Sequence, residues 1–333
     1  MTSVGVVIGC YNHERYLEEC IESVLKQTTP PDRVIVVDDS SNDESRTIVK
    51  SYSQRGVELI RCNRVGPSRV YNTGVSAIDT DIVAIVSADD ACVADRLGRQ
   101  TLLMHRSGTD LVLGLPIVID EDSQIRSDAL APEFFRLFES GRGPLLRQLF
   151  LSGNFLCAAT ATFRRSTFLS LGGFHPGLLQ LQDFHLWLRW SWRGMVVSDD
   201  RVSYYRKASG SLSAPSNDRR MNAERAWVYR HAFDEIPADV VASAFKADLP
   251  RGAPLHHRAL DLALIFLQHP DQLAYQIGCE GLLDVLSGED GCALLDSYGI
   301  TMQDVFSWTA RSDVTGSAAR ESIMNELLAR IAE

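Results

Sequence analysis

The sequence predicts an α/β fold: a Rossmann-like, mostly parallel sheet flanked by helices, followed by a C-terminal helical region. Up to about residue 120, short apolar runs rich in β-branched residues alternate with segments whose apolar residues recur at helical spacing. Such alternation is typical of parallel βαβ units, whose helices cover both faces of the sheet. Beyond about residue 220 the apolar spacing is helical only. These observations favour one domain over residues 1–220, with halves at 1–120 and 121–220, and a helical region over 221–333.

The first unit begins with Val4 to Ile8, a β-branched run that predicts a buried strand. A helix follows, with Asn12 as its expected N-cap. Its apolar stripe has the i, i+3, i+4 spacing of one helical face and consists of Leu17, Cys20, Ile21, Val24 and Leu25. Pro30-Pro31 ends this helix, and Val34 to Val37 predicts the second buried strand.

The alternation continues with two further strands. A second helix carries Ile48, Val49 and Tyr52 on one side. Val57 to Ile60 and Ile82 to Val86 predict the third and fourth strands, with a helix over Asn72 to Ala77 between them. Residues 151–213 mix short strand-like pieces with a helix that carries Trp187, Trp190 and Trp192.

The composition is that of a globular protein, with 45% of the 333 residues hydrophobic and 23% charged. A formal net charge of −10 argues against nucleic acid as a partner, because such a partner needs a basic face. Neither a secretory signal nor the roughly 20 uninterrupted apolar residues of a membrane-spanning helix is visible. The seven cysteines lack CxxC spacing, which favours reduced core thiols in a cytoplasmic protein.

Polar and acidic residues follow three of the predicted strands, as Tyr11-Asn12, Asp38-Asp39 and Asp89-Asp90. In an open parallel sheet, ligands bind beyond the carboxyl ends of the strands, so these segments should share one rim. Four carboxylates there repel one another unless cations or hydrogen-bond donors offset their charge. A divalent cation held by one or two of them and by a substrate's phosphates resolves the repulsion. The residues alone therefore indicate that a metal ion and a nucleotide bind together at this one edge of the sheet.

Three other patterns carry less weight. Gly9 to Asn12 follows the first strand where GxGxxG or GxxxxGK[ST] would stand, which disfavours a dinucleotide dehydrogenase or a P-loop nucleotide hydrolase. Asp79-Thr80-Asp81 precedes the fourth strand and is expected at the opposite end of the sheet. Asp120-Glu121-Asp122 is expected to be a surface turn.

Five segments, taken in order, resemble family 2 of the inverting GT-A glycosyltransferases. They are Val6 to Asn12, Ser23 to Asp43, Asn72 to Val75, Ser87 to Asp90 with Asp95 to Leu97 behind it, and Gly172 to Phe174 followed by Gln182 to Arg189. The resemblance covers roughly residues 3–213. It implies that residues 1–220 form a GT-A domain.

The resemblance also implies roles for the rim residues. Asp39 would meet the nucleobase or ribose, with Tyr11 near the base and Asn12 beside it. Asp89 would approach the ribose or diphosphate, and Asp90 would be the principal ligand of Mn²⁺ or Mg²⁺. The cation would neutralise the charge that builds up on the departing diphosphate.

In the second half, Asp183 would be the general base that deprotonates the acceptor hydroxyl, so that a single displacement inverts the anomeric centre. Four residues depart from the family pattern around the metal, the phosphates and the base: Ser87, Gln182, Tyr71 and Ala208. Three nearby cations could compensate, with Arg69 assigned to the nucleotide and Arg206 and Lys207 to the phosphates.

The sequence thus predicts transfer of a sugar from a nucleoside diphosphate sugar, expected to be UDP-linked, to a glycan, a lipid-linked or a small-molecule acceptor. Two alternatives stay open. One is a catalytically inactive sugar-nucleotide-binding module, which Ser87 and Gln182 favour. The other is a sugar nucleotidyltransferase, which is disfavoured because such enzymes usually need a glycine-rich loop with basic residues after the first strand, and this chain has none there. The helical region is expected to pack on the domain, with a homodimer or a membrane surface as alternatives. The expected location is cytoplasmic, with peripheral association at the inner face of a membrane left open.

Overall fold

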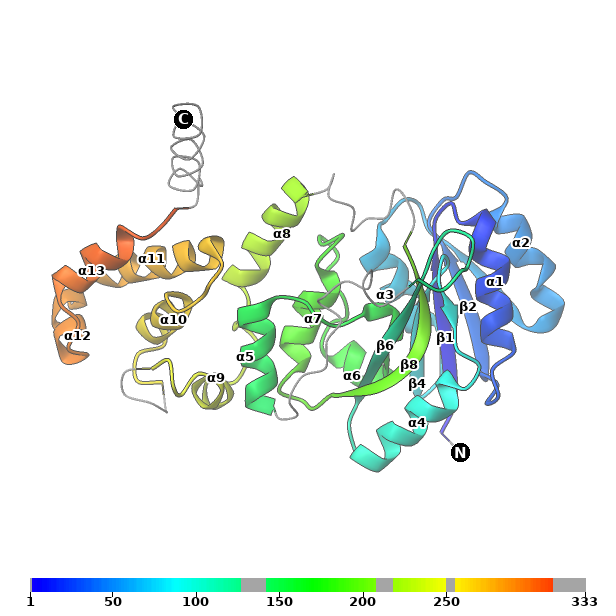
Figure 1. The fold of residues 1–333 in the computed structure, drawn as a ribbon, viewed down its shortest axis with the longest axis horizontal. Coiled ribbons are helices and arrows are strands. Elements are labelled where there is room, and N and C mark those ends of the chain that lie inside the picture. Colours follow the sequence, from blue (N-terminus) through cyan, green and yellow to red (C-terminus); the bar gives the residue numbers. More distant parts are fainter. Residues whose placement is uncertain (1, 127–141, 208–217, 250–254, 314–333) are drawn as a thin grey trace, which may run out of the picture. The chain divides into compact units, whose positions relative to one another are not determined.

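The computed structural model describes residues 2–126, 142–207, 218–249 and 255–313 (Figure 1). By its internal contacts the chain forms two compact units, Met1–Arg225 and Ala226–Glu333. The first unit contains the sheet, and the described part of the second is helical. Ala208, one of the four departures from the family pattern, lies outside the described residues.

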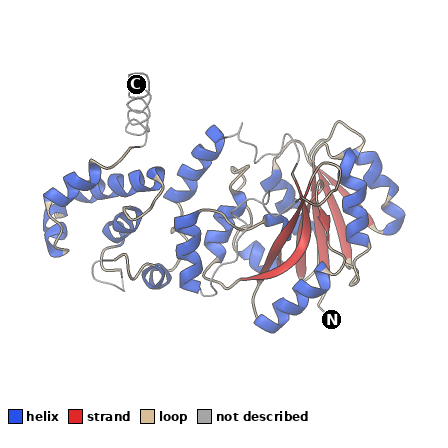
Figure 2. Ribbon diagram, viewed as in Figure 1, coloured by secondary structure: helices blue, strands red, loops and turns tan. Residues whose placement is uncertain are grey.

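An eight-stranded sheet forms the centre of the first unit (red in Figure 2), in the order β3-β2-β1-β4-β7-β6-β8-β5. The strands are β1 (Val4–Cys10), β2 (Arg33–Asp38), β3 (Val57–Arg61), β4 (Ile82–Ser87), β5 (Ala91–Cys92), β6 (Leu111–Ile119), β7 (Thr162–Arg164) and β8 (Val196–Arg206). β1 pairs in parallel with β2 and β4, β2 with β3, and β6 with β8. β7 is antiparallel to both β4 and β6, and β5 to β8. The predicted mostly parallel sheet is confirmed.

Helices cover both faces of this sheet because successive side chains of a strand point to opposite faces. The helices of this part of the chain are α1 (Glu14–Leu25), α2 (Ser45–Ser51), α3 (Pro67–Ala77), α4 (Arg96–Ser107), α5 (Arg142–Ser152), α6 (Arg165–Ser170), α7 (Gln182–Trp190) and α8 (Asp218–Arg230). Not all of them lie on the sheet, and α8 continues past Arg225 into the second unit. Val6 and Ile8 of β1 belong to one core cluster with the apolar stripe of α1. Val7 faces the other side, where a Cβ at Gly74 of α3 would lie 2.3 Å from its Cγ1.

Two local predictions were wrong. Asn12 does not cap α1, because the helix begins at Glu14 and Asn12 adopts a left-handed φ of 55°. Its side-chain oxygen instead accepts the N–H of Asn42 (2.9 Å). The third helix starts at Pro67 rather than at Asn72, and proline is favoured at the first position of a helix.

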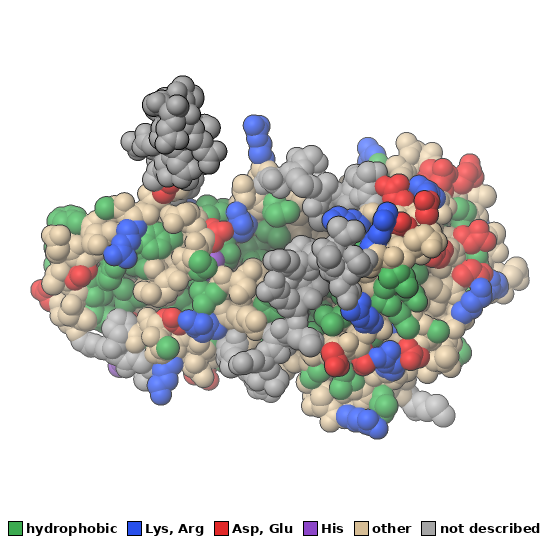
Figure 3. Space-filling model, in the orientation of Figure 1, with side chains coloured by type: hydrophobic (Ala, Val, Ile, Leu, Met, Phe, Trp, Pro, Cys, Tyr) green, Lys and Arg blue, Asp and Glu red, His purple; other side chains and the backbone are tan. Residues whose placement is uncertain are grey.

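The strands β1, β2, β3, β4, β6 and β8 all run in one direction, so the residues after them meet at one edge of the sheet. The segment Asp79-Thr80-Asp81 lies at the opposite edge, as predicted, and Asp79 pairs there with Arg33 (2.7 Å). Asp120-Glu121-Asp122 forms the predicted turn, but it follows β6 at the same edge as Asp89 and Asp90. On the visible face, the described acidic and basic side chains are interspersed (Figure 3).

Asn72 joins α3 to the turn that precedes α7. Its Nδ2 donates to the carbonyl oxygen of Phe174 (2.8 Å), and its Oδ1 accepts the N–H of Phe174 (2.9 Å). Gly173 has a φ of 67°, and a Cβ there would lie 2.6 Å from Asn72 Oδ1. Two motifs about 100 residues apart thus form one contact.

We expect Gly173→Ala to destabilise the protein by about 1–3 kcal/mol, because it adds a clash to a left-handed backbone conformation. Gly56→Ala is the matched control, since Gly56 has a φ of 82° but nothing within 4 Å of the added Cβ. Urea unfolding measures the loss of unfolding free energy in both variants, and the difference between the two losses gives the contribution of the clash. Equal losses of unfolding free energy would contradict the close packing of Gly173 against Asn72 and the Phe168 ring.

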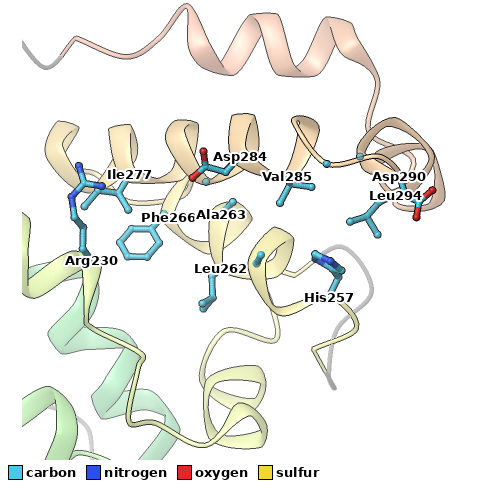
Figure 4. A pocket seen from close by; sticks show the side chains of 14 residues that line it. Arg230, His257, Leu262, Ala263, Phe266, Ile277, Asp284, Val285, Asp290 and Leu294 are labelled. Carbon is cyan, nitrogen blue, oxygen red and sulfur yellow. The ribbon is translucent and has the colours of Figure 1, made fainter.

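The second unit contains α9 (Ala238–Ala244), α10 (Arg258–Phe266), α11 (Gln272–Leu286), α12 (Gly291–Ser297) and α13 (Met302–Thr309). Leu260, Leu264, Leu282, Leu295 and Val305 belong to its core. A groove of about 540 Å³ lies along α10 and α11, with Phe266 and Val285 in its lining and Arg230 and Asp290 toward opposite ends (Figure 4). Among the described residues, none of the helices combines the length and apolar composition that a membrane crossing requires. Pairing of two chains through these helices stays a prediction.

Candidate active site

Asp89 and Asp90 follow β4 at the carboxyl edge of the sheet. Asp90 is 3% exposed, and its Oδ1 accepts the N–H of Arg206 (2.8 Å). Burial and the neighbouring charge of Asp89 raise the pKa of Asp90 well above its usual range. Asp89 is more accessible; it accepts a hydrogen bond from Ser87 Oγ, and its Oδ2 lies 3.9 Å from His13 Nε2. Two adjacent carboxylates of this kind favour a positively charged ligand.

The pair fits a divalent cation that substrate oxygens help to bind. In the part of the chain that the structure describes, no three His, Cys, Asp or Glu side chains form a group that could hold a metal. Hard cations such as Mg²⁺ and Mn²⁺ are commonly held by one or two carboxylates together with substrate phosphates. The raised pKa of Asp90 marks a carboxylate whose ionised form gains from a nearby cation. Asp90 and Asp89 are therefore the residues that would hold it.

Asp39 follows β2 and organises the loop that leads into α3. The side chain is 7% exposed, and its two oxygens accept the N–H groups of Val65 (2.7 Å) and Gly66 (2.9 Å). Its own N–H donates to the carbonyl oxygen of Cys10 (2.9 Å), which ties the ends of β1 and β2 together. A nucleoside could reach this carboxylate only through lone pairs that the two amides leave free.

Tyr11 and Asn12 form the neighbouring loop after β1. Tyr11 is 38% exposed, and the Arg64 guanidinium lies 5.2 Å from its ring centroid and donates to its hydroxyl group. Asn12 donates its N–H to Ser41 Oγ (2.9 Å). Left-handed φ angles occur at Asn12, Ser40 and Arg64, which follow β1, β2 and β3 respectively. Such conformations in non-glycine residues are costly and cluster at ligand sites, which favours binding at this edge.

Asp183 lies in the first turn of α7. Its Oδ2 accepts a hydrogen bond from Asn154 Nδ2 (2.8 Å), and its Oδ1 accepts the N–H of Phe184 (2.7 Å). Burial, only partly offset by these two donors, raises the pKa of Asp183 to about 6. A carboxylate with this pKa is ionised at neutral pH and is still basic enough to accept a proton from a reacting hydroxyl.

Glu224 of α8 holds the start of α7. Its two carboxylate oxygens accept the N–H groups of Leu179 (3.0 Å), Gln180 (2.8 Å) and Leu181 (3.0 Å). Negative charge and acceptors are favourable at a helix N-terminus, where backbone N–H groups lack partners. Glu224 therefore positions the turn from which Asp183 projects.

Asp90 and Asp183 share a region of the first unit. The buried thiol of Cys157 lies within electrostatic reach of both carboxylates, and their charges add to the burial that raises its pKa. Tyr71 of α3 is half-buried, and its hydroxyl donates to the carbonyl oxygen of Val86 (3.2 Å). Desolvation raises the pKa of that hydroxyl, and the charges of Asp89 and Asp90 raise it further. The Cys157 thiol is thus influenced by a carboxylate after β4 and by the carboxylate of α7.

The three predicted cations differ in their surroundings. The Arg206 side chain is 1% exposed, and it donates to the carbonyl oxygens of Asp89 (2.7 Å) and Asp120 (2.8 Å). A bound diphosphate would have to displace these contacts. Lys207 and Arg69 are exposed, so their charges are free to approach a ligand.

Sequence reasoning missed several residues of the site. Asn154, Glu224 and His13 have no local signal, because each acts on a residue that the fold brings to it from elsewhere. Glu19 belongs to the exposed side of α1, but it pairs with the buried Arg206 (2.6 Å). The i, i+3, i+4 pattern identifies the buried face of a helix and gives no information about which exposed side chain meets a distant loop.

Comparison with known proteins agrees with this architecture. The fold resembles that of S. aureus TarS 1–349 in complex with UDP-GlcNAc, with a TM-score of 0.56 at 16% identity over 92% of this chain and 89% of that one. It also resembles the mannosyltransferase PcManGT from Pyrobaculum calidifontis in complex with GDP-Man and Mn2+, with a TM-score of 0.54 at 16% identity over 89% and 79% of the two chains. At these identities the likeness concerns the fold. The sheet and its flanking helices thus form a GT-A-like fold.

Sequence comparison identifies the family. The family model described as "Glycosyl transferase family 2" matches residues 5–172, and the chain belongs to this family. It is 31% identical over 205 residues to the uncharacterized protein MT1568 of Mycobacterium tuberculosis, covering 58% of this chain and 63% of that protein. It is 25% identical over 237 residues to the amylovoran biosynthesis glycosyltransferase AmsE of Erwinia amylovora, covering 68% and 80%. The match thus spans less than two thirds of the length of MT1568.

Proposed function

We propose that the protein transfers a sugar from a nucleoside diphosphate sugar to an acceptor hydroxyl with inversion at the anomeric carbon. The observation that carries the proposal is the acidic pair Asp89-Asp90 at the carboxyl edge of the sheet, where Asp90 is 3% exposed and accepts the N–H of Arg206. Residues 1–220 would form the catalytic domain, and residues 221–333 would be a helical addition to it.

Each group of residues has a part in this reaction. Tyr11, Asn12, Asp39 and Arg69 would surround the nucleoside, and Lys207 would approach the diphosphate. Asp90, with Asp89 beside it, would hold Mn²⁺ or Mg²⁺, which neutralises charge on the departing diphosphate. Asp183 would accept the proton of the acceptor hydroxyl as its oxygen bonds to the anomeric carbon and the bond from that carbon to the diphosphate breaks.

UDP is the nucleotide we propose. The named ligands of the structural neighbours are UDP-GlcNAc for TarS and GDP-Man for the mannosyltransferase, so both nucleotides fit proteins of this fold. A polysaccharide or another glycoconjugate would be the product, in keeping with the amylovoran biosynthesis named for AmsE.

Ligand binding tests the proposal directly. UDP or a UDP-sugar is expected to raise the melting temperature only when Mn²⁺ or Mg²⁺ is present, since a ligand at 100 times its Kd adds about 2.7 kcal/mol to stability. GDP and GDP-sugars are the matched comparison. Absence of any metal-dependent shift with every nucleotide would contradict the proposed donor class, and binding without release of UDP on any acceptor would favour an inactive binding module.

A further inference from the structure

We propose that Arg206 is a positioning residue of the cation and nucleotide site, and that Glu19 is the counter-ion that keeps it in place. The proposal rests on the proposed function, because it takes Asp89 and Asp90 as the residues that hold the cation. It adds β8 and α1 to the elements on which that site depends. Neither side chain is expected to touch the reacting atoms.

The Arg206 guanidinium joins three segments at the carboxyl edge. Its Nε donates to the carbonyl oxygen of Asp89 (2.7 Å), and its Nη1 donates to the carbonyl oxygen of Asp120 (2.8 Å). Its Nη2 donates to Glu19 Oε2 (2.6 Å). The ring of Tyr16 lies against it, with the centroid 4.2 Å from the central carbon. The loop after β4, the turn after β6 and helix α1 therefore meet on one side chain.

Arg206 also holds two consecutive acidic residues through different atoms. Its backbone N–H donates to Asp90 Oδ1 (2.8 Å), while its side chain holds the carbonyl oxygen of Asp89. Together these bonds fix the peptide between Asp89 and Asp90 relative to β8. The direction in which the Asp90 carboxylate faces is therefore set by the end of β8, more than 100 residues further along the chain.

Glu19 supplies the negative charge that the buried guanidinium needs. Its side chain is 44% exposed, whereas that of Arg206 is 1% exposed. Ser123 Oγ donates to the same Glu19 oxygen (2.8 Å) and also accepts from Arg206 Nη1 (3.0 Å), which closes a small network. A buried charge whose partner is removed is strongly disfavoured, so the position of Arg206 depends on Glu19.

The planar fork of arginine is needed for this arrangement. Three acceptors from separate segments lie around the guanidinium, and a lysine ammonium is a compact point charge that cannot reproduce the same set of directions. Arg206→Lys keeps the positive charge but loses the planar set of N–H donors that reaches the three acceptors. Glu19→Gln keeps an acceptor oxygen but loses the charge, and it alters a half-exposed side chain that leaves the core intact.

The experiment compares these two variants with Glu22→Gln in the full chain. Glu22 lies on the same helix and pairs with Lys26 (3.1 Å) and Arg55, away from the network. The Kd of Mn²⁺ is measured by electron paramagnetic resonance in the presence of UDP, and kcat and the donor KM are measured over a range of Mn²⁺ concentrations. Melting temperatures show whether each variant is folded at the assay temperature.

We expect Arg206→Lys to raise the Kd of Mn²⁺ by about 10-fold or more, as the loss of groups that orient metal ligands commonly does. Glu19→Gln is expected to raise it by several-fold, and Glu22→Gln is expected to match the wild type. Excess Mn²⁺ should restore most of the kcat of both site variants, because the defect lies in binding the cation. If Arg206→Lys does not fold, Glu19→Gln decides the question.

Two results would overturn the positioning role. One is a Kd of Mn²⁺ in Arg206→Lys and Glu19→Gln equal to that of Glu22→Gln. The other is a loss of activity in folded variants that excess Mn²⁺ does not restore, since general damage to the domain produces that pattern. A wild-type protein that binds neither UDP nor GDP with Mn²⁺ would instead contradict the proposed function itself, whatever the variants do.

Discussion

Asp183→Asn is expected to lower kcat by about 10³-fold, because general base catalysis of this kind contributes roughly 10²–10⁴-fold. The asparagine side chain has nearly the same shape and can still accept a hydrogen bond, so the turn held by Glu224 should stay in place. The KM of the donor should therefore change little. Steady-state kinetics with UDP release as the readout checks this result, and turnover equal to that of the wild type would exclude Asp183 as the base.

The pH dependence of the reaction provides an independent check on the same residue. Burial raises the pKa of Asp183 to about 6, and a general base acts only when it is ionised. We expect kcat/KM to fall about tenfold per pH unit below about 6 and to level off above it. The residual activity of Asp183→Asn should not fall in this way at low pH. If the same fall persists in that variant, the titrating group is a residue other than Asp183.

The same pKa shift also makes stability depend on pH. The dependence is opposite to that of a salt-bridged surface carboxylate, whose contribution to stability is lost as the pH falls. The pKa of Asp183 is raised from 3.8 to about 6, so the folded state binds this proton more tightly than the unfolded chain does. The contribution of Asp183 to stability is therefore most favourable at low pH and declines as the pH rises through that interval. Asp183→Asn removes the decline, which unfolding in urea at two pH values can measure.

Asp90→Asn is expected to abolish metal-dependent binding of the nucleotide and to lower kcat/KM by about 10³-fold, as a loss of several kcal/mol of charge stabilisation implies. Asparagine can still accept the N–H of Arg206, so the network around β8 should survive. Titration with Mn²⁺ in the presence of UDP measures the loss. Wild-type Mn²⁺ affinity in this variant would show that the cation lies elsewhere.

In the absence of metal, the same substitution should not destabilise the protein. Asp90 is 3% exposed and lies beside the charge of Asp89, so ionising it in the folded state is unfavourable. With EDTA present, the melting temperature of Asp90→Asn is expected to equal or exceed that of the wild type. Active sites commonly carry such a conflict between function and stability.

The N-terminal half could be predicted from the sequence because its signals are local. Parallel strands buried on both faces appear as short β-branched runs, and β1, β2, β3 and β4 were all located by such runs. The residues directly after them then followed from the rule that ligands bind at the carboxyl ends of parallel strands. Asp39, Asp89 and Asp90 do lie at that edge.

The second half could not be predicted in the same way, because its strands pair across long separations. β6 pairs in parallel with β8 over a connection of more than 70 residues, and no local pattern specifies that partner. The support of Asp183 is likewise non-local, since Asn154 and Glu224 come from segments on either side of α7. The family resemblance pointed to Arg206 as a cation near the site, but only the pairing of the strands shows which groups surround it.

The carboxylate of Asp39 has a consequence for mutagenesis at this site. Because it receives the amides of Val65 and Gly66, Asp39→Ala would release the loop before α3 at the same time as it removed a nucleoside contact. A loss of activity in that variant would therefore combine two defects that kinetics alone cannot separate. Asp39→Asn, which keeps one amide acceptor, together with a structure of the variant protein, would assign the loss to recognition or to loop geometry.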